Sequence, residues 1–345
     1  MPKWVGNRFG IPVGVTTFYV SAVHNLFDQY YAKTSGGWKS EPFQASGGTA
    51  TWTATHGGLT YRYHAFPGSA NFTVSSGIST AEALVVAGGG GGGAGRDSGG
   101  GGAGGLRTIT SATLTPGTYP IVVGSGGAGG PYWPGWSLGN AHASAQRGGT
   151  SSAFGFDSTG GGGRQGPSGP PNTAPGGSGA GANFATTSGN AGNTPPVSPP
   201  QGNPGGRGAY QYPGPEPGFV SGGGGGAGAA GGAGTNPPVR AGDGGIGRRS
   251  DDMGPQPWSI PTSYGTPGPQ PGRYFAGGGG GGAGSFQGQP GGGTGGAGGG
   301  GSKPSGSGTA NIGGGGGGGL FNLTNNYAGG SGGSGMVFVR YIQQS

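Results

Sequence analysis

The chain has 345 residues, of which 101 are glycine and 30 are proline, and only 7% are charged. The formal charge of +7 is spread without a basic run, which argues against a nucleic-acid partner, and the absence of cysteine excludes disulfides and thiolate zinc sites. No apolar stretch is long enough for a membrane helix, and the first residues lack the pattern of a secretory signal. We therefore expect a soluble protein that neither inserts into a membrane nor binds nucleic acid.

Residues 1–45 contain few glycines and include the segment VSAVHNLFDQYY. Its apolar side chains recur at spacings of three and four residues, the period of one helix face. They are Val20, Val23, Phe27 and Tyr31. The spacing predicts one short helix whose apolar stripe packs either within the chain or on a neighbouring molecule. We expect residues 1–45 to be an attachment and oligomerisation segment.

Residues 46–87 alternate between apolar and polar residues, which is the period of a half-buried strand. The alternating stretches are ATWTAT, LTYRYHAF and NFTVSS, separated by Gly-rich and Pro-rich turns, and LVV from residue 84 is the last of them. We therefore expect a small antiparallel β region over 46–87.

Residues 88–345 hold most of the glycines, including six in a row from Gly88 and seven in a row from Gly313. Glycine costs more backbone entropy on ordering than any other residue, so a flexible linker is the simplest explanation. The many aromatic residues between the runs argue against a linker. A collagen triple helix is excluded because no strict Gly-X-Y frame survives.

Several glycine-rich stretches place their non-glycine residues at every third position. Ala227, Ala230 and Ala233 follow this rule, as do Ser125 and Ala128. A polyproline II helix has three residues per turn and no internal hydrogen bonds, so these residues would line one edge of each helix. Edges without side chains can approach closely enough for backbone groups of neighbouring helices to bond to one another. The pattern predicts that residues 88–345 form a domain of packed rods.

Segments rich in proline and aromatic residues separate the glycine runs, for example PYWPGWSLGN from residue 131. They are expected to be connectors at the ends of the rods, where binding residues concentrate on a rigid scaffold. Trp and Tyr present a stackable face with a polar tip, which suits sugars or surface proteins. The candidate receptor-binding residues are Tyr132, Trp133, Trp136, Tyr210, Tyr212, Trp258 and Tyr264. The alternative is that these aromatic residues cap the rods.

Four strings of the sequence resemble the glycine-rich domain of bacteriophage tail fibres and other virion proteins. They are LVVAGGGGGG from residue 84, GGGGAGGLRT from 99, LTPGTYPIVVGSGGAGG from 114 and GGSGMVFVRYI from 332. The resemblance covers about residues 46–345, and it implies a polyglycine II sandwich whose loops contact the host surface. The fold class we expect is a small N-terminal helix, a β-hairpin or sheet region, and a domain of packed polyglycine II helices with short flanking strands.

Catalytic and cofactor motifs are not apparent in the sequence. The GxGxxG pattern is uninformative in a chain so rich in glycine, no phosphate-binding P-loop occurs, and the acidic residues are dispersed. His56 and His64 across one hairpin are more simply strand polar residues than metal ligands. We therefore expect no enzymatic activity, no metal and no cofactor.

Together the residues and the resemblance predict a virion structural protein, most simply a tail fibre or adhesin. Its aromatic loops would bind a host glycan or outer-membrane protein, residues 1–45 would bind other virion proteins, and the analogy with fibres suggests a homotrimer. The alternative is a capsid or neck decoration with only a structural role. An ice-binding protein is disfavoured because the period-three edges mix several residue types. The expected location is the exterior of the virion, after synthesis in the host cytoplasm.

Overall fold

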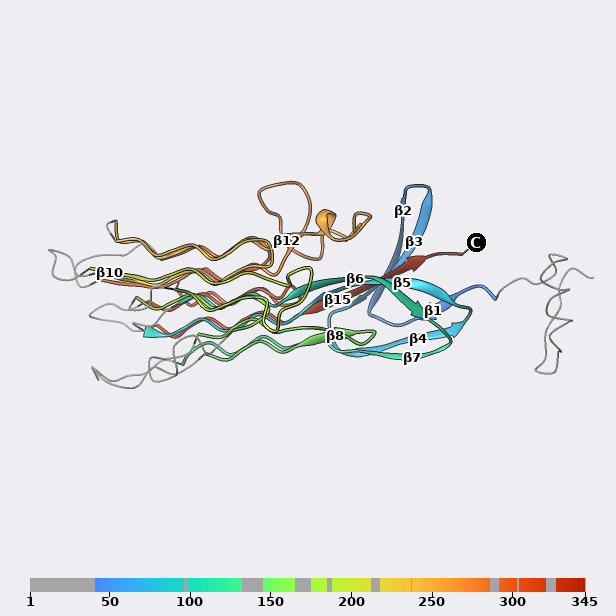
Figure 1. Cartoon of the computed structure of the whole chain (residues 1–345), viewed down its shortest axis with the longest axis horizontal. Helices are drawn as coiled ribbons and strands as arrows, with labels where there is room; N and C mark the ends of the chain where they lie inside the picture. The colour runs from blue at the N-terminus through green and yellow to red at the C-terminus, as the bar shows by residue number, and fades with distance from the viewer. Residues whose placement is uncertain are drawn as a thin grey trace, which may run out of the picture.

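The structure is a computed structural model that describes residues 41–95, 99–131, 145–164, 175–184, 188–211, 218–236, 238–285, 292–302, 304–320 and 327–344. These residues form an elongated body with β-sheets at one end and a bundle of extended glycine-rich segments at the other (Figure 1). The strands are short outside the sheet end. In chain order they are β1 (Gln44–Ser46), β2 (Ala50–His56), β3 (Leu59–Phe66), β4 (Ala70–Ser76), β5 (Ser79–Val86), β6 (Leu106–Leu114), β7 (Gly117–Ile121), β8 (Ser151–Ala153), β9 (Phe156–Ser158), β10 (Ala209–Gln211), β11 (Gly218–Val220), β12 (Arg248–Arg249), β13 (Tyr274–Phe275), β14 (Ala283–Ser285) and β15 (Met336–Ile342).

The largest sheet has five antiparallel strands in the order β2-β3-β15-β5-β6. Its central strand, β15, comes from the end of the chain, and it pairs with β3 on one side and with β5 on the other. The strands β2 to β5 form where the alternating sequence predicts them. β4 does not join this sheet, because it pairs with β1 and β7 in a second sheet of three strands.

Both faces of the five-stranded sheet are buried, which explains why β15 is almost continuously apolar. Val337, Val339 and Tyr341 point into a cluster shared with Phe66 and Phe72. The alternate residues of β15, Met336 and Phe338, belong to a second cluster that includes Trp258 and Phe275. The strand alternation therefore divides the apolar side chains between two cores, one on each side of the sheet.

The glycine-rich segments are hydrogen-bonded to one another through their backbones. The N–H groups of Gly88, Gly89 and Gly90 donate to three different segments, at Gly149, Gly333 and Gly102. Three residues later, Gly91, Gly92 and Gly93 donate to the same three segments again, with N···O distances of 2.9 Å throughout. A chain that meets the same neighbour every third residue has the threefold repeat of the polyproline II conformation. We call these extended segments the glycine rods.

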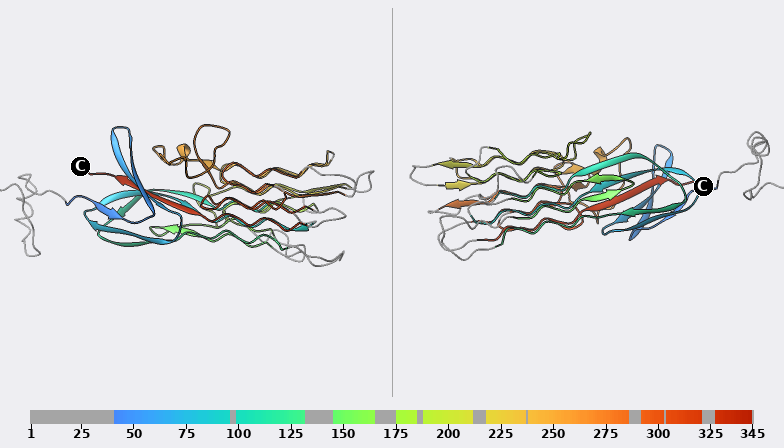
Figure 2. Two further views of the ribbon diagram at one scale, coloured as in Figure 1. Left: turned by 180° about the vertical axis from the view of Figure 1, so that it is seen from behind. Right: turned by 60° about the horizontal axis from the view of Figure 1, so that its bottom comes forward.

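Exposure along the rods follows the same repeat of three. Gly124, Gly127 and Gly130 are buried, whereas Ser125 and Ala128 are exposed. The non-glycine positions of this rod therefore lie on its outer edge. The two further views in Figure 2 show the rods running side by side along the long axis of the molecule.

The interior rods require glycine because their backbones are in contact. A Cβ built at Gly316 would lie less than 3.0 Å from the carbonyl group of Gly330. The N–H of Gly316 donates to the oxygen of Gly90, and its own oxygen accepts from Gly101, so both of its backbone groups are paired. Backbone pairing on three sides satisfies polar groups that burial would otherwise leave without partners.

The expected fold class is wrong. The described residues contain no α-helix; η2 (Ser250–Asp252) is a 3-10 turn of three residues, and most of the structure is built from several antiparallel sheets and the glycine rods. The helix predicted around Val20, Val23, Phe27 and Tyr31 lies outside the described residues, which begin at residue 41 and start with the strands of the sheet end. The physical reason for the error is that the spacing of apolar residues in one segment does not show what covers them. The strands between residues 46 and 121 are instead fixed by hydrogen bonding to one another and to β15.

Candidate recognition site

The aromatic residues singled out from the sequence are distributed over both ends of the molecule. Tyr132, Trp133, Trp136 and Tyr212 lie outside the described residues. Tyr210 belongs to β10, where its backbone pairs with Phe219 of β11. This small sheet is at the end of the rods opposite the five-stranded sheet (Figure 1). Trp258 and Tyr264 are instead next to the five-stranded sheet, so these seven residues do not form one cluster.

Trp258 is part of the core and offers little surface for a receptor. Its side chain is 1% exposed, and its ring meets Tyr63 edge to face. Tyr264 is half-buried and packs between Trp52 and Phe338. These two aromatic residues therefore hold the segment between β12 and β13, residues 250–273, against the sheet. We refer to this segment as the 250–273 loop.

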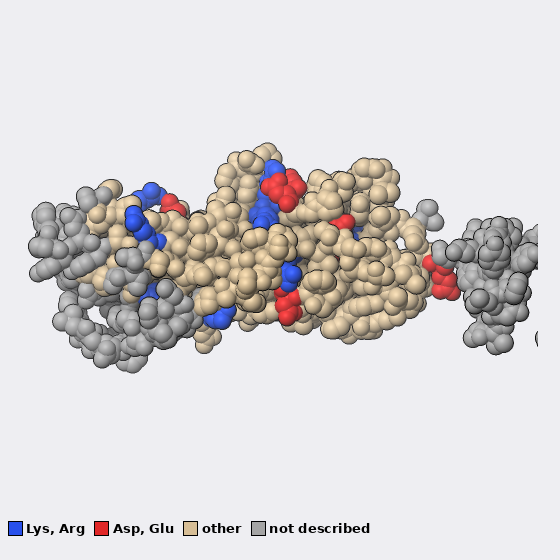
Figure 3. Space-filling model, viewed as in Figure 1, with Lys and Arg blue, Asp and Glu red and all other residues tan. Residues whose placement is uncertain are grey.

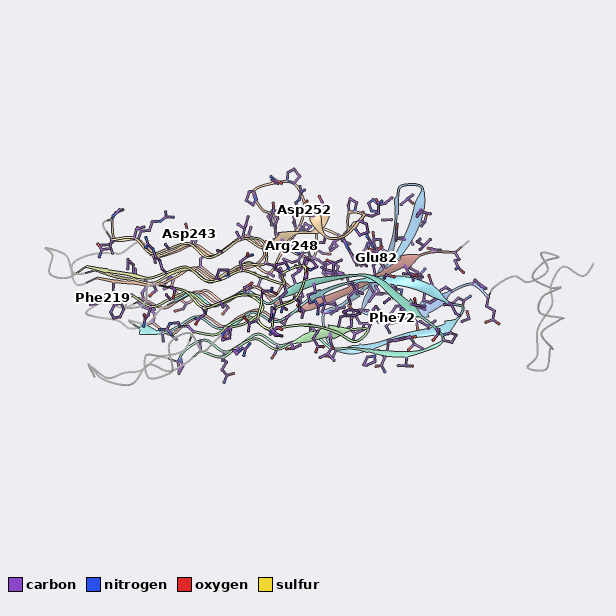
Figure 4. All side chains as sticks on the ribbon, in the orientation of Figure 1. Phe72, Glu82, Phe219, Asp243, Arg248 and Asp252 are labelled. Carbon is purple, nitrogen blue, oxygen red and sulfur yellow. The ribbon has the colours of Figure 1, made fainter. Side chains whose placement is uncertain are left out.

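A buried arginine of the five-stranded sheet also holds the 250–273 loop in place. Arg340 of β15 is fully buried and donates through Nη2 to Glu82 Oε2 at 2.6 Å, while its Nη1 donates to the carbonyl oxygen of Pro257 at 2.7 Å. Its guanidinium also lies 4.3 Å from the ring centre of Trp258. A desolvated cation over an indole contributes about 2 kcal/mol. Figure 4 labels Glu82 at the base of the β2–β3 hairpin.

A cleft of about 510 Å³ lies between this loop and the end of the β2–β3 hairpin. One wall is His56, and the remaining lining residues come from the loop: Ser250, Asp251, Pro257, Trp258, Ser259, Ile260, Thr262, Gly272 and Arg273. His56 Nε2 and Ser259 Oγ are 2.7 Å apart, and Trp52 Nε1 donates to the carbonyl oxygen of Ser259 at 2.8 Å. Hairpin and loop are thus joined directly at the cleft.

The arginines at the two ends of the loop, Arg249 of β12 and Arg273, both have hydrogen-bond partners in this region. Arg249 donates to both carboxylate oxygens of Asp252, at 2.7 and 3.1 Å, and these hydrogen bonds lower the pKa of Asp252. Arg273 donates to the carbonyl oxygens of Tyr264 and Gly265. Figure 3 shows acidic and basic side chains gathered on this part of the surface, and Figure 4 labels Arg248 and Asp252 there. Asp251 is exposed and accepts from the Ser250 hydroxyl at 2.9 Å.

The cleft has the chemistry of a binding site more than that of a catalytic centre. The spacing of His56 and Ser259 suits a base and its nucleophile, but among the described residues no carboxylate is bonded to the second ring nitrogen of His56. Within the same part of the chain, no group of three His, Asp or Glu side chains is placed to hold a metal ion. What remains is a set of hydroxyl, imidazole and carboxylate groups beside apolar walls.

A family model described as a glycine-rich domain matches residues 64–342. The chain belongs to the glycine-rich domain family. The match starts within β3 and ends at the last residue of β15, so it includes the glycine rods and the strands β5, β6 and β15 of the five-stranded sheet, whereas β2 precedes it. A search of curated proteins finds no match to this glycine-rich domain protein. No helix in the described ranges is long and apolar enough to span a membrane.

Among the cleft residues of this glycine-rich domain protein, Trp258 was selected from the sequence as a receptor-binding candidate, and His56 was considered only as a metal ligand. His56 and Ser259 are about two hundred positions apart, and neither is in a recognisable motif. The only local signal is the Pro-rich segment MGPQPWSIPTSYGTPGPQPGRYF from residue 253, which interrupts the glycine runs.

Proposed function

We propose that this glycine-rich domain protein is a bacteriophage virion protein, a tail fibre or adhesin that presents recognition loops on a rigid glycine scaffold. The observation that carries the proposal is the separation of the two ends. The described chain starts beside the sheet, and its C-terminal strand β15 also ends there, whereas the rods extend in the opposite direction (Figure 1). One end is thus suited to attachment and the other to display.

The far end of the rods supports the display of loops. The chain leaves a rod at Pro131 and re-enters one at Ala145. Gly130, just before the exit, donates to Gly92, while Ala145 donates to Arg164, which itself donates to Gly91 of the same rod as Gly92. The connector with Trp133 and Trp136 therefore departs from and returns to a hydrogen-bonded layer. A rigid base reduces the entropy that a loop loses when it binds, which favours affinity. We propose that Tyr132, Trp133, Trp136 and Tyr212 contact the host receptor, a surface glycan or an outer-membrane protein.

One observation favours the alternative, a capsid or neck decoration with a structural role only. At the far end, Phe184 and Phe219 pack on one another with ring centres 4.8 Å apart, and Phe219 is 5% exposed. Aromatic residues at this end thus close the rods in at least one place. If the connectors do the same throughout, their tryptophans stabilise the scaffold and bind nothing.

Adsorption of the protein to host cells separates the two possibilities. We expect Trp133→Ala combined with Trp136→Ala to abolish adsorption and to change the melting temperature by no more than about 2 °C. Phe156→Ala is the matched control, because Phe156 is 41% exposed but lies at the sheet end. A large fall in melting temperature with adsorption retained would favour the decoration role and contradict the adhesin.

Attachment through the N-terminal segment needs a separate test. Phe43 is 5% exposed and packs on Tyr341, and β1 begins at Gln44, so the last residues of the segment 1–45 are part of the folded body. A deletion should therefore remove only residues 1–40. We expect the shortened protein to fold, to lose its place on assembled particles, and to change from trimer to monomer in light scattering. Particles that retain the shortened protein would show that it is attached elsewhere.

A further inference from the structure

The cleft between the β2–β3 hairpin and the 250–273 loop is preformed. Its loop wall is held at three separate points: Arg340 bonds to the carbonyl of Pro257, Trp52 bonds to the carbonyl of Ser259, and Arg273 bonds to the carbonyls of Tyr264 and Gly265. These donors are side chains of the sheet or of the loop itself, and Arg340 is completely buried. A site whose walls are fixed in this way loses little entropy on binding.

The polar groups of the cleft are mostly acceptors and hydroxyls. Asp251 supplies a carboxylate, and within the described part of the chain its hydrogen-bond donor is the neighbouring Ser250 hydroxyl. His56, Ser259 and Thr262 add an imidazole and two hydroxyls, while Pro257 and Ile260 add apolar surface. Carboxylates and hydroxyls accept and donate to the hydroxyls of a ligand, and apolar walls cover its C–H faces. At about 510 Å³ the cleft is within the size range of small-molecule sites.

Other ligand classes fit this lining less well. An anion would face the Asp251 carboxylate, while the guanidinium of Arg273 is already bonded to two carbonyl oxygens and Arg249 is paired with Asp252. A metal ion would find no group of three acidic or histidine ligands among the described residues. An apolar ligand would cover part of the carboxylate and hydroxyl groups without offering them hydrogen bonds, which lowers its affinity.

We propose that this cleft is a binding site for an uncharged sugar, with Asp251 and His56 bonding its hydroxyl groups. The site is on the side of the sheet end, away from the connectors at the far end of the rods. It is therefore independent of the proposed receptor-binding loops, and it does not require the protein to be an adhesin.

The test is a titration of the full-length protein with lactose, maltose and cellobiose, followed by nuclear magnetic resonance. The comparators are the anionic trisaccharide 3′-sialyllactose and the cation spermidine. We expect saturable binding of at least one of the three neutral disaccharides, and at least tenfold weaker binding in Asp251→Ala, because a hydrogen bond to a charged group is lost. His56→Ala should also weaken binding.

Asp252→Ala is the matched control, because this neighbouring acid pairs with Arg249 and does not line the cleft. It should bind the disaccharide as the unmodified protein does. The proposal is overturned if none of the three disaccharides binds saturably, if Asp251→Ala and Asp252→Ala bind equally well, or if only spermidine or only sialyllactose binds. Asp251 is exposed, so its replacement leaves the fold intact, and an unchanged melting temperature verifies this for each variant.

Discussion

The sheet end and the glycine rods bury their backbones in different ways. At the sheet end, two clusters of apolar side chains cover the faces of the five-stranded sheet. Among the described rod residues, the separate apolar cluster contains only Val220, Ala241 and Ala283 at its centre. The rods are instead held by hydrogen bonds from each segment to several neighbours. The comparison shows that a buried region can be specified by backbone contact alone, provided that no side chain separates the chains.

The largest expected effect comes from adding one methyl group inside the rods. Gly316→Ala places a Cβ against the carbonyl of Gly330, where only backbone could move aside, so we expect the free energy of unfolding to fall by at least about 4 kcal/mol. Gly68→Ala is the matched control, because nothing lies within 4 Å of its Cβ. It should leave stability unchanged or raise it by about 0.5 kcal/mol. Urea denaturation measures both, and equal effects would contradict the close-packed rods.

At the sheet end, the next largest effect should come from the buried ion pair. Arg340→Met leaves Glu82 without its cation and frees the carbonyls of Gln256 and Pro257, so we expect a loss of about 3 kcal/mol. The double variant Arg340→Met with Glu82→Met should be clearly more stable than the single one, because no buried charge is left unpaired. If the double variant is the less stable of the two, the ion pair itself is the main source of stability.

A smaller effect at the sheet end depends on pH. Burial lowers the pKa of His64 below its ordinary value of 6.5, although the hydrogen bond from its Nδ1 to the Gly47 carbonyl opposes this. Below pH 6.5 the unfolded chain therefore binds a proton at His64 more readily than the folded chain does. The free energy of unfolding then falls as the pH decreases, by up to about 1.4 kcal/mol per pH unit. Chemical denaturation between pH 7.5 and about pH 5 should show this slope. His64→Asn should flatten it, whereas a slope that persists in this variant would assign it to other groups.

The smallest effect concerns an exposed ion pair on the rods. Arg240 and Asp243 are 2.7 Å apart, and their side chains are 61% and 40% exposed, so Arg240→Ala should cost less than about 0.5 kcal/mol. Asp243 also accepts hydrogen bonds from the backbone N–H and the hydroxyl of Thr294. Asp243→Ala should therefore cost about 1 kcal/mol, twice as much as its partner. Thermal unfolding of the two variants measures the difference, and equal costs would mean that the bonds to Thr294 add nothing.

Local patterns in the sequence determined the conformation of single segments. Alternation over ATWTATH and LTYRYHAF corresponds to β2 and β3, because the side chains of a strand point to opposite faces in turn. The period of three in Ser125 and Ala128 corresponds to the exposed edge of a rod, because a chain with three residues per turn returns every third side chain to the same edge. Both periods arise from the geometry of one chain, so they are visible without its neighbours.

Only the tertiary structure decided which segments lie together. Gly88, Gly89 and Gly90 bond to segments that are far apart in the sequence, and glycine has no side chain that could mark one partner over another. The cleft has the same origin, because His56 contacts Ser259 in a loop that Arg340 of β15 holds against the sheet. Trp258 was selected for its aromatic face, yet its burial depends on that distant arginine and on Tyr63. Contacts of this range depend on the packing of the whole chain, and no short stretch of residues encodes them.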